Sequence, residues 1–291
     1  MSSAKGLSVA VASAGSPEMV IACLDGLAKA REQAPFPVDA YFARARSAED
    51  VSAAFKDLAW AHLTLSDASV DIPHLRGIAM QEAGDGWIAV TEDIFRPHET
   101  WLASLAAATE SGADVIGGAI GNLRRRPADH AAYLTDYGAY APSRAPDIGT
   151  STQTGSNVAY SPSIAGRVAE WCRDGAWEHI VHDRLLSEGA RLDFAPSVQV
   201  DHNKSYDFKS LMRTRFEQGR EYARDHMAEN GSGGRWIRIL ATPIMPFLQT
   251  ARLARTASGT GTGDFLRALP HSFLLYASWT AGETLGFLKK P

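Results

Sequence analysis

The sequence predicts an α/β protein with a mostly parallel, helix-covered sheet, followed by a helical appendage. Three observations predict it. Short apolar runs alternate with stretches of helical periodicity between residues 8 and 202. Of the 291 residues, 45% are hydrophobic and 21% charged, as in proteins that bury a core. Beyond that region the strand pattern gives way to basic, amphipathic helical patterns. We therefore divide the chain into a domain of residues 1–205 and a helical region of residues 206–291.

The elements of the domain follow in strand–helix order. We expect strands at residues 8–13, 38–43, 61–65, 87–90, 115–120 and 192–200. We expect helices at residues 19–31, 48–58, 72–83, 97–112 and 177–188. Residues 124–153 contain prolines and no clear period, which predicts a long functional or disordered loop.

Two groups of residues follow strands in this arrangement. Ala14, Gly15 and Ser16 come after the first strand, and Glu92 and Asp93 come at the end of the fourth. Ligands of such sheets bind beyond the carboxyl ends of the strands, so we expect these residues to face one site.

Charge, cysteine spacing and the first residues of the chain limit the partners and the cellular location that we expect. A net charge of −4 makes duplex nucleic acid a poor partner. Cys23 and Cys172 are far apart and form no CxxC metal signature, so we expect both to be reduced. Residues 1–6 lack the regions of a signal peptide, so we expect the catalytic part in the cytoplasm.

Four motifs occur in order along the domain. The first is Trp87–Asp93 (WIAVTED), followed by Pro97 and Trp101-Leu102. The other three are Gly155–Tyr160 (GSNVAY), Trp177-Glu178 ahead of Arg184-Leu185-Leu186 and Gly189, and Phe194–His202 (FAPSVQVDH).

Together these motifs resemble the family-2 glycosyltransferases of the GT-A fold, over residues 8–202. The resemblance implies a Rossmann-like mixed sheet that binds a nucleotide-diphosphate sugar, with a UDP-sugar the expected donor, and transfers the sugar with inversion. The bacterial, membrane-associated members are the most similar type.

The resemblance also implies a divalent cation, Mn²⁺ or Mg²⁺, which would neutralise the leaving diphosphate. Asp93 matches the last acidic residue of the family's DxD-like motif and would ligate the metal, and Glu92 would shape the donor site. His202 matches a histidine that often completes the metal site. The more ordinary interpretations are a turn or helix cap for Asp93 and a structural histidine for His202.

The same resemblance assigns the acceptor side. Glu178 matches the acidic residue that takes the proton of the acceptor hydroxyl, a role that chemistry requires of some carboxylate in an in-line attack. Gly155, Ser156 and Asn157 match the loop over the sugars, and Ala14, Gly15 and Ser16 would meet the nucleotide. The more ordinary interpretation of Glu178 is an exposed residue on the surface of a helix.

The sequence departs from the family pattern twice. Residues 41–47 (YFARARS) contain no aspartate where the family reads the base, and the acidic motif is Thr91-Glu92-Asp93 rather than Asp-x-Asp. The first departure bears on which nucleobase the donor carries, and the second bears on the geometry of metal binding.

The helical region is basic and partly apolar. Lys209, Arg213, Arg215 and Arg220 repeat at helical spacing, which fits a solvated face, an anionic lipid surface, or contact of Arg215 and Arg220 with the donor diphosphate. Residues 236–253 and 265–288 are apolar. We interpret both as interfacial or re-entrant helices that attach the protein to the cytoplasmic face of the inner membrane. The alternatives are that they pair with each other or form an oligomer interface.

We therefore predict a hexosyltransferase that glycosylates a hydroxyl of a lipid or of a lipid-linked, cell-envelope glycan. A non-catalytic sugar- or nucleotide-binding protein on a decayed scaffold stays open, as does a nucleotidyltransferase. The latter would need a basic phosphate loop, but residues 12–16 contain no Lys or Arg.

Overall fold

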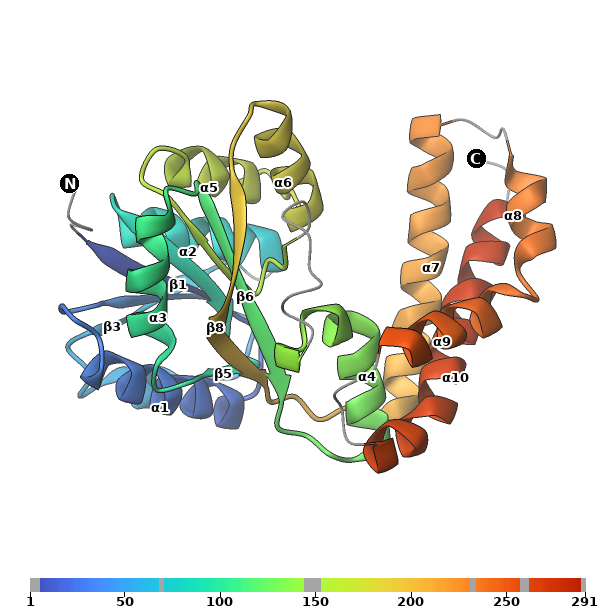
Figure 1. The fold of residues 1–291 in the computed structure, drawn as a ribbon, viewed down its shortest axis with the longest axis horizontal. Helices are drawn as coiled ribbons and strands as arrows, with labels where there is room; N and C mark the ends of the chain where they lie inside the picture. Colours follow the sequence, from blue (N-terminus) through green and yellow to red (C-terminus); the bar gives the residue numbers. More distant parts are fainter. Residues whose placement is uncertain (1–5, 68–70, 144–152, 231–233, 257–261, 289–291) are drawn as a thin grey trace. The chain divides into compact units, whose positions relative to one another are not determined.

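The computed structural model describes residues 6–67, 71–143, 153–230, 234–256 and 262–288 (Figure 1). The glycine-rich stretch of residues 231–234 is typical of a hinge, and residues 231–233 of it lie outside these ranges. Residues 144–152 of the expected loop also lie outside them.

A mixed sheet forms the centre of the first part of the chain, in the order β3-β2-β1-β4-β7-β6-β8-β5. Its strands are β1 (Leu7–Ser13), β2 (Ala40–Ala45), β3 (Ala61–Ser66), β4 (Trp87–Glu92), β5 (Phe95–Pro97), β6 (Val115–Asn122), β7 (Asn157–Tyr160) and β8 (Leu192–His202). Neighbours among β1 to β4 run parallel, as do β6 and β8, whereas β7 is antiparallel to β4 and β6. The predicted mixed α/β sheet is confirmed.

Helices pack against this sheet, and its central strands β1, β4 and β6 are buried along most of their length. The helices of this part are α1 (Pro17–Glu32), α2 (Ile72–Ala83), α3 (Trp101–Ala108), α5 (Ala165–Arg173) and α6 (Glu178–Ser187). Side chains of β1 alternate between the faces, and Ala10 and Ala12 join one core cluster with Leu75 and Met80 of α2 and Val168 of α5. The helix expected at residues 48–58 is reduced to a 3₁₀ turn, Ser52–Phe55.

The register brings three chain segments to one edge of the sheet. Ala12 of β1 pairs with Glu92 of β4, and Thr91 pairs with Asn157 of β7. The carboxyl ends of β1 and β4 therefore meet the beginning of β7. This edge contains the motifs that the sequence singled out.

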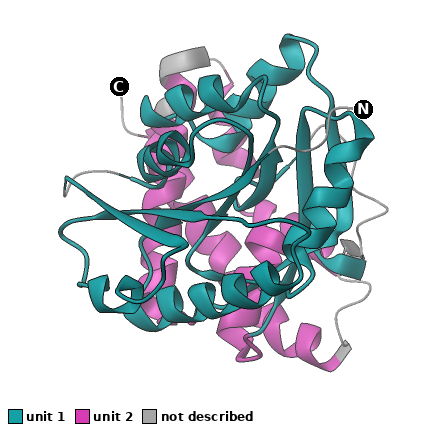
Figure 2. Cartoon of the chain, turned by 90° about the vertical axis from the view of Figure 1, so that its left-hand side faces the viewer, with its two compact units in different colours: residues 1–123, 140–204 teal, residues 124–139, 205–291 magenta. Residues whose placement is uncertain are grey.

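The chain forms two compact units (Figure 2). Unit 1 comprises residues 1–123 and 140–204, and unit 2 comprises residues 124–139 and 205–291. The boundary after residue 204 lies next to the one expected after residue 205. The stretch 124–139 contains α4 (Pro127–Tyr137) and belongs with the C-terminal helices, which the sequence did not suggest.

Unit 2 is helical, and its two long helices are in close contact. Its other helices are α7 (Phe208–Asn230), α8 (Arg235–Ala241), α9 (Met245–Thr256) and α10 (Thr262–Leu288). A Cβ added at Gly219 of α7 would collide with the backbone of Trp279, and one at Gly282 of α10 would collide with that of Phe216. Glycine thus allows the two backbones to approach. Within the described ranges, no helix is both long and apolar enough to cross a bilayer.

Candidate functional site

Asp93 follows β4 and joins the carboxyl ends of β1 and β4. It is 2% exposed. Its Oδ2 accepts a 2.6 Å hydrogen bond from the Ser13 hydroxyl, and its carboxylate also accepts the Gly15 backbone N–H at 3.0 Å. Burial raises the pKa of Asp93, while these hydrogen bonds and the charge of Arg44 oppose the rise. As arranged, Asp93 fixes the turn after β1.

Arg44 completes this first cluster, and sequence reasoning missed it. Its Nη1 lies 3.5 Å from Asp93 Oδ2 and donates to the Ser13 hydroxyl at 3.0 Å. Its Nη2 donates to the Gly15 carbonyl at 2.9 Å. Arg44 ends the buried part of β2, in the segment where the family pattern would have an aspartate. A buried charge needs a partner, and the cation of Arg44 explains why the carboxylate of Asp93 can be buried.

A second cluster lies around Arg76 of α2, which is 1% exposed and was also missed. Its Nη2 lies 3.5 Å from Glu92 Oε1, and its Nη1 lies 3.3 Å from Glu178 Oε2. Two acidic residues from separate sequence motifs thus share one guanidinium. Ser156 supports Glu92, because its hydroxyl donates to Oε1 at 2.7 Å.

The spacing around Arg76 depends on Gly155. A Cβ at Gly155 would lie 2.7 Å from both terminal nitrogens of the guanidinium. Any larger residue would displace the arginine or the loop. Gly155 and Ser156 therefore form one wall of the second cluster. This cluster includes Glu178, which the sequence analysis also assigned to the acceptor side.

The carboxylates of the second cluster differ in exposure. The side chain of Glu92 is 13% exposed and that of Glu178 is 32% exposed. Burial raises the pKa of Glu92, with smaller increases from the charges of Glu178 and Asp93, while Arg76 and Ser156 lower it. Glu178 begins α6 and is the member of the pair that solvent or a ligand can reach.

Neutral polar groups surround the second cluster. Burial lowers the pKa of His182 to about 4 and raises that of Tyr140 to about 12. His182 Nε2 lies 3.0 Å from the hydroxyl of Tyr160, whose pKa burial also raises. At neutral pH these three side chains carry no charge, so Arg76, Glu92 and Glu178 dominate the local field.

The side chain of Asn157 joins several elements of the fold, and its contact with a sugar stays a prediction. It is 1% exposed. Its amide nitrogen donates to the carbonyls of Ala119 and Val198, and its oxygen accepts the indole N–H of Trp101, all at 2.9 Å. Every hydrogen-bonding group of the amide is thereby used to join β7 to β6, β8 and α3.

The residues expected to hold a metal ion do not fit one as arranged. Both oxygens of Asp93 accept hydrogen bonds, and Arg44 already supplies the opposing charge. His202 is fully buried and packs its ring on Phe95, its partner in the β5–β8 pair. No group of three or more potential ligands gathers in the part of the chain that the structure describes. A metal-binding role for Asp93 and His202 would need these contacts to rearrange, and it stays a prediction.

The turn after β1 remains accessible. Ala14 is exposed, and Gly15 and Ser16 are partly exposed. Ser16 precedes α1, and its hydroxyl donates to Glu18 at 2.6 Å. This turn adjoins the first cluster through the contacts of Gly15, so the structure brings it together with Glu92 and Asp93.

Arg215 and Arg220 belong to unit 2, where each has a local partner. Arg215 is bonded to Asp136 of α4, and Arg220 lies 3.0 Å from Glu217. Arg215 and Asp136 help to line a cavity of about 210 Å³ together with Tyr276 and Trp279. Their contact with a donor diphosphate stays a prediction.

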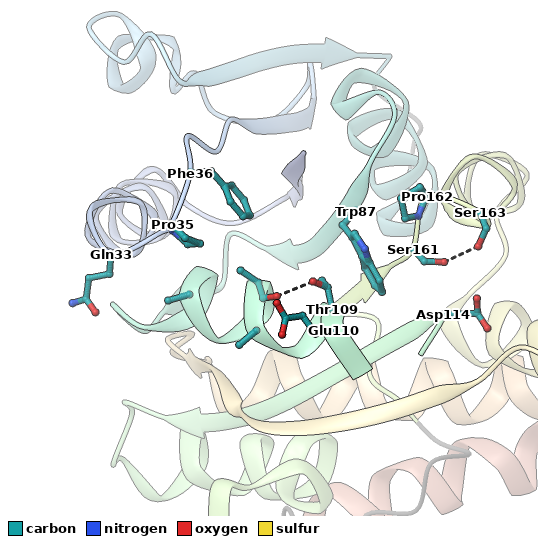
Figure 3. A pocket seen from close by; sticks show the side chains of 13 residues that line it. Gln33, Pro35, Phe36, Trp87, Thr109, Glu110, Asp114, Ser161, Pro162 and Ser163 are labelled. Carbon is teal, nitrogen blue, oxygen red and sulfur yellow. Dashed lines mark hydrogen bonds between the residues drawn. The ribbon is translucent and has the colours of Figure 1, made fainter. Parts of the chain in front are cut away.

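A cavity of about 920 Å³ lies at the opposite edge of the sheet (Figure 3). Trp87, the first residue of β4, lines it, as do Asp114 just before β6 and Ser161 just after the antiparallel β7. These positions mark the amino ends of the parallel strands. Its size does not make it the candidate site, because the acidic motifs lie at the carboxyl ends.

Comparisons with known proteins do not identify a family for this chain. No family model matches the sequence, and no curated protein does so significantly. Among solved structures, a mannosyltransferase, PcManGT from Pyrobaculum calidifontis in complex with GDP-Man and Mn²⁺, matches with a TM-score of 0.49 and 14% identity, over 94% of this chain and 86% of that one.

Two structures of S. aureus TarS 1–349 also match. One has a TM-score of 0.42 and 11% identity, over 92% of this chain and 90% of that one. The other, in complex with UDP-GlcNAc, has a TM-score of 0.46 and 10% identity, over 94% and 91%. Likenesses at this level carry no conclusion about the activity of this chain, which must be argued from its own residues.

Proposed function

We propose that the protein is an inverting glycosyltransferase that moves a hexose-type sugar from a nucleotide diphosphate to an acceptor hydroxyl. One observation carries the proposal. Glu92 of the Thr91–Asp93 motif and Glu178, 86 positions apart, meet on the buried guanidinium of Arg76. Motifs that the resemblance assigns to the donor and the acceptor thus share one charged cluster.

In the proposed reaction Glu178 is the general base. Its partly exposed carboxylate takes the proton of the acceptor hydroxyl while that oxygen attacks the anomeric carbon. The bond to the diphosphate breaks in the same step, and the nucleotide diphosphate leaves with the electron pair. A single displacement inverts the anomeric centre.

Arg76 and Glu92 are positioning residues in this proposal. Arg76 holds the Glu178 carboxylate at the start of α6, and Ser156 and Arg76 together hold Glu92 at the end of β4. The exposed turn at Ala14–Ser16 is the proposed nucleotide contact, with a UDP-sugar the expected donor. The proposed acceptor is a lipid or lipid-linked glycan at the cytoplasmic face of a membrane.

The first experiment separates donor binding from chemistry. Nucleotide diphosphates and their sugars are screened by thermal shift, where a ligand at about 100 times its Kd adds about 2.7 kcal/mol of stability. With the donor so identified, Glu178→Gln should reduce transfer by a factor of about 10² to 10⁴ and retain the donor-induced shift. Asp183→Asn, an exposed acid on the same helix, is the matched control and should transfer normally.

Three outcomes decide among the alternatives. Unchanged turnover in Glu178→Gln would remove this residue from the base role. Donor stabilisation without any transfer, tested with lipid and glycan acceptors, would favour a non-catalytic binding protein. No stabilisation by any nucleotide would contradict the proposal as a whole.

A further inference from the structure

Unit 2 exposes large apolar side chains along α8, the turn at residues 242–244 and the start of α9. Six large side chains of this segment are between 46% and 77% exposed. They are Trp236, Ile237, Leu240, Ile244, Phe247 and Leu248, which we call the α8–α9 surface. Soluble monomers rarely leave so many neighbouring apolar side chains in water, so this surface calls for a partner.

The opposite face of the same segment is already packed within unit 2. Ile239 packs against a small core of Ala223, Met227 and Phe287. The hydroxyls of Thr242 and Thr284 lie 2.7 Å apart. One side of the segment is therefore anchored to α7 and α10. On the other side Phe247 contacts the ring of Phe273 of α10 at 4.9 Å between centroids, yet it stays 63% exposed, and Ile237 and Leu240 are more than 70% exposed.

Charge indicates the nature of the partner. Between Gly234 and Gly263 the sequence has four arginines (235, 238, 252 and 255) and no acidic residue, although Arg238 pairs with Glu283 of α10 at 3.6 Å. The guanidinium of Arg235 lies 5.1 Å from the ring of Trp236, so a cation borders the apolar surface itself. Two copies of such a surface would bring like charges together, which disfavours self-association. An anionic lipid surface matches both the apolar and the basic side chains.

We propose that the α8–α9 surface docks this protein on an anionic bilayer, with Trp236 at the headgroup level and the leucine, isoleucine and phenylalanine side chains below it. Two prolines interrupt the segment, so it lies in the interface instead of spanning it. Helix α10 is the scaffold and not a second insertion element, because its glycines hold it against α7. The inference is independent of the glycosyl transfer proposed above.

The test is flotation of the full chain with vesicles, either of pure phosphatidylcholine or with about a third phosphatidylglycerol. The wild-type protein should float with the anionic vesicles. Ile237→Ser combined with Leu240→Ser and Phe247→Ser should reduce the bound fraction about tenfold or more, since three large apolar groups no longer enter the interface. The matched control is Leu266→Ser with Leu274→Ser and Leu285→Ser on α10, three exposed leucines that should leave binding unchanged.

Charge and self-association are tested in the same series. Arg235→Glu with Arg252→Glu should remove the preference for anionic vesicles. Sedimentation velocity without lipid should show a monomer. The proposal is overturned if the wild-type protein does not float, if the α8–α9 variant binds as well as wild type, or if a lipid-free dimer dissociates in that variant. Thermal midpoints should stay close to wild type because every altered side chain is at least partly exposed, with the largest decrease in the variant that loses the ring contact between Phe247 and Phe273.

Discussion

Arg76→Met tests whether the second cluster is held together by one cation. Methionine keeps the apolar stem of the arginine and removes the guanidinium that Glu92 and Glu178 share. Removing one partner of a buried ion pair costs about 3–5 kcal/mol. The two contacts here are long, 3.5 and 3.3 Å, and the Glu178 side chain is 32% exposed and so partly screened. We therefore expect a loss at the low end, about 3 kcal/mol, mostly from Glu92.

The loss should depend on pH in a defined direction. The pKa of Glu92 is already raised by burial, and without the guanidinium it rises further. A carboxyl whose folded pKa exceeds its unfolded value penalises folding at high pH, and the penalty disappears as the pH falls to where both states are protonated. The difference in unfolding free energy between variant and wild type should therefore shrink between pH 7.5 and pH 5.

Urea denaturation at both pH values measures these differences. Arg167→Met is the control, because it breaks an exposed pair with Glu188 and should cost less than about 1 kcal/mol. Adding Glu92→Gln to Arg76→Met should recover more than about 1 kcal/mol of the loss. A loss that is independent of pH, or that Glu92→Gln does not relieve, would refute the ion-pair explanation.

Three further predictions follow from the neighbouring groups. Asp93→Asn should lower stability by about 3 kcal/mol even in EDTA, because it leaves the buried Arg44 without a counter-ion; a variant of wild-type stability in urea would argue for a ligand-binding role. Stability should decrease by about 3 kcal/mol as the pH falls from about 6.5 to about 4, because His182 stays neutral in the fold and protonates when unfolded; His182→Gln should flatten that profile, and an identical slope would contradict the assignment. Gly155→Ala should lower donor or acceptor affinity more than it lowers stability, since its methyl group would stand 2.7 Å from the guanidinium of Arg76. Calorimetric titration measures the affinity, and thermal melting of the same sample measures the stability. A large loss of stability with unchanged affinity would show that the glycine is only structural.

The sequence predicted elements well where a local signal marks them. The helix at 72–83 begins with Asp71 as its N-cap and Pro73 in its first turn, and it was expected with those bounds. The strand β4 (Trp87–Glu92) was expected at residues 87–90. Its four central residues are buried in succession, and a short apolar run of this kind is typical of a strand in the middle of a helix-covered sheet.

Helix α4 was missed because its burial has no period. Residues 128–134 are buried consecutively, including Asp129 and His130, so no polar face marks a helix. Asp129 finds its partners 77 residues away, in the backbone N–H of Tyr206, and no local pattern encodes that contact. Its segment was therefore read as an irregular loop.

The acidic residues of the site were named from the sequence, but their cations were not. Arg76 bonds to residues 16 and 102 positions away, and such pairings arise only from the tertiary fold. One local signal existed: Arg76 stands at helical spacing with Ala79, Met80 and Ala83, on the buried side of α2. A charged residue within an apolar stripe implies a buried partner.

The chain passes between the two units three times, after residues 123, 139 and 204. The C-terminal helices are therefore not a detachable module, and a gene fusion or stop codon after residue 204 would leave α4 without the helices on which it packs. A nick at that position would have a different effect from a truncation. The two fragments would each hold part of unit 2, with α4 on one and Tyr206 on the other, and they should behave as a complementing pair that reassembles without a covalent link.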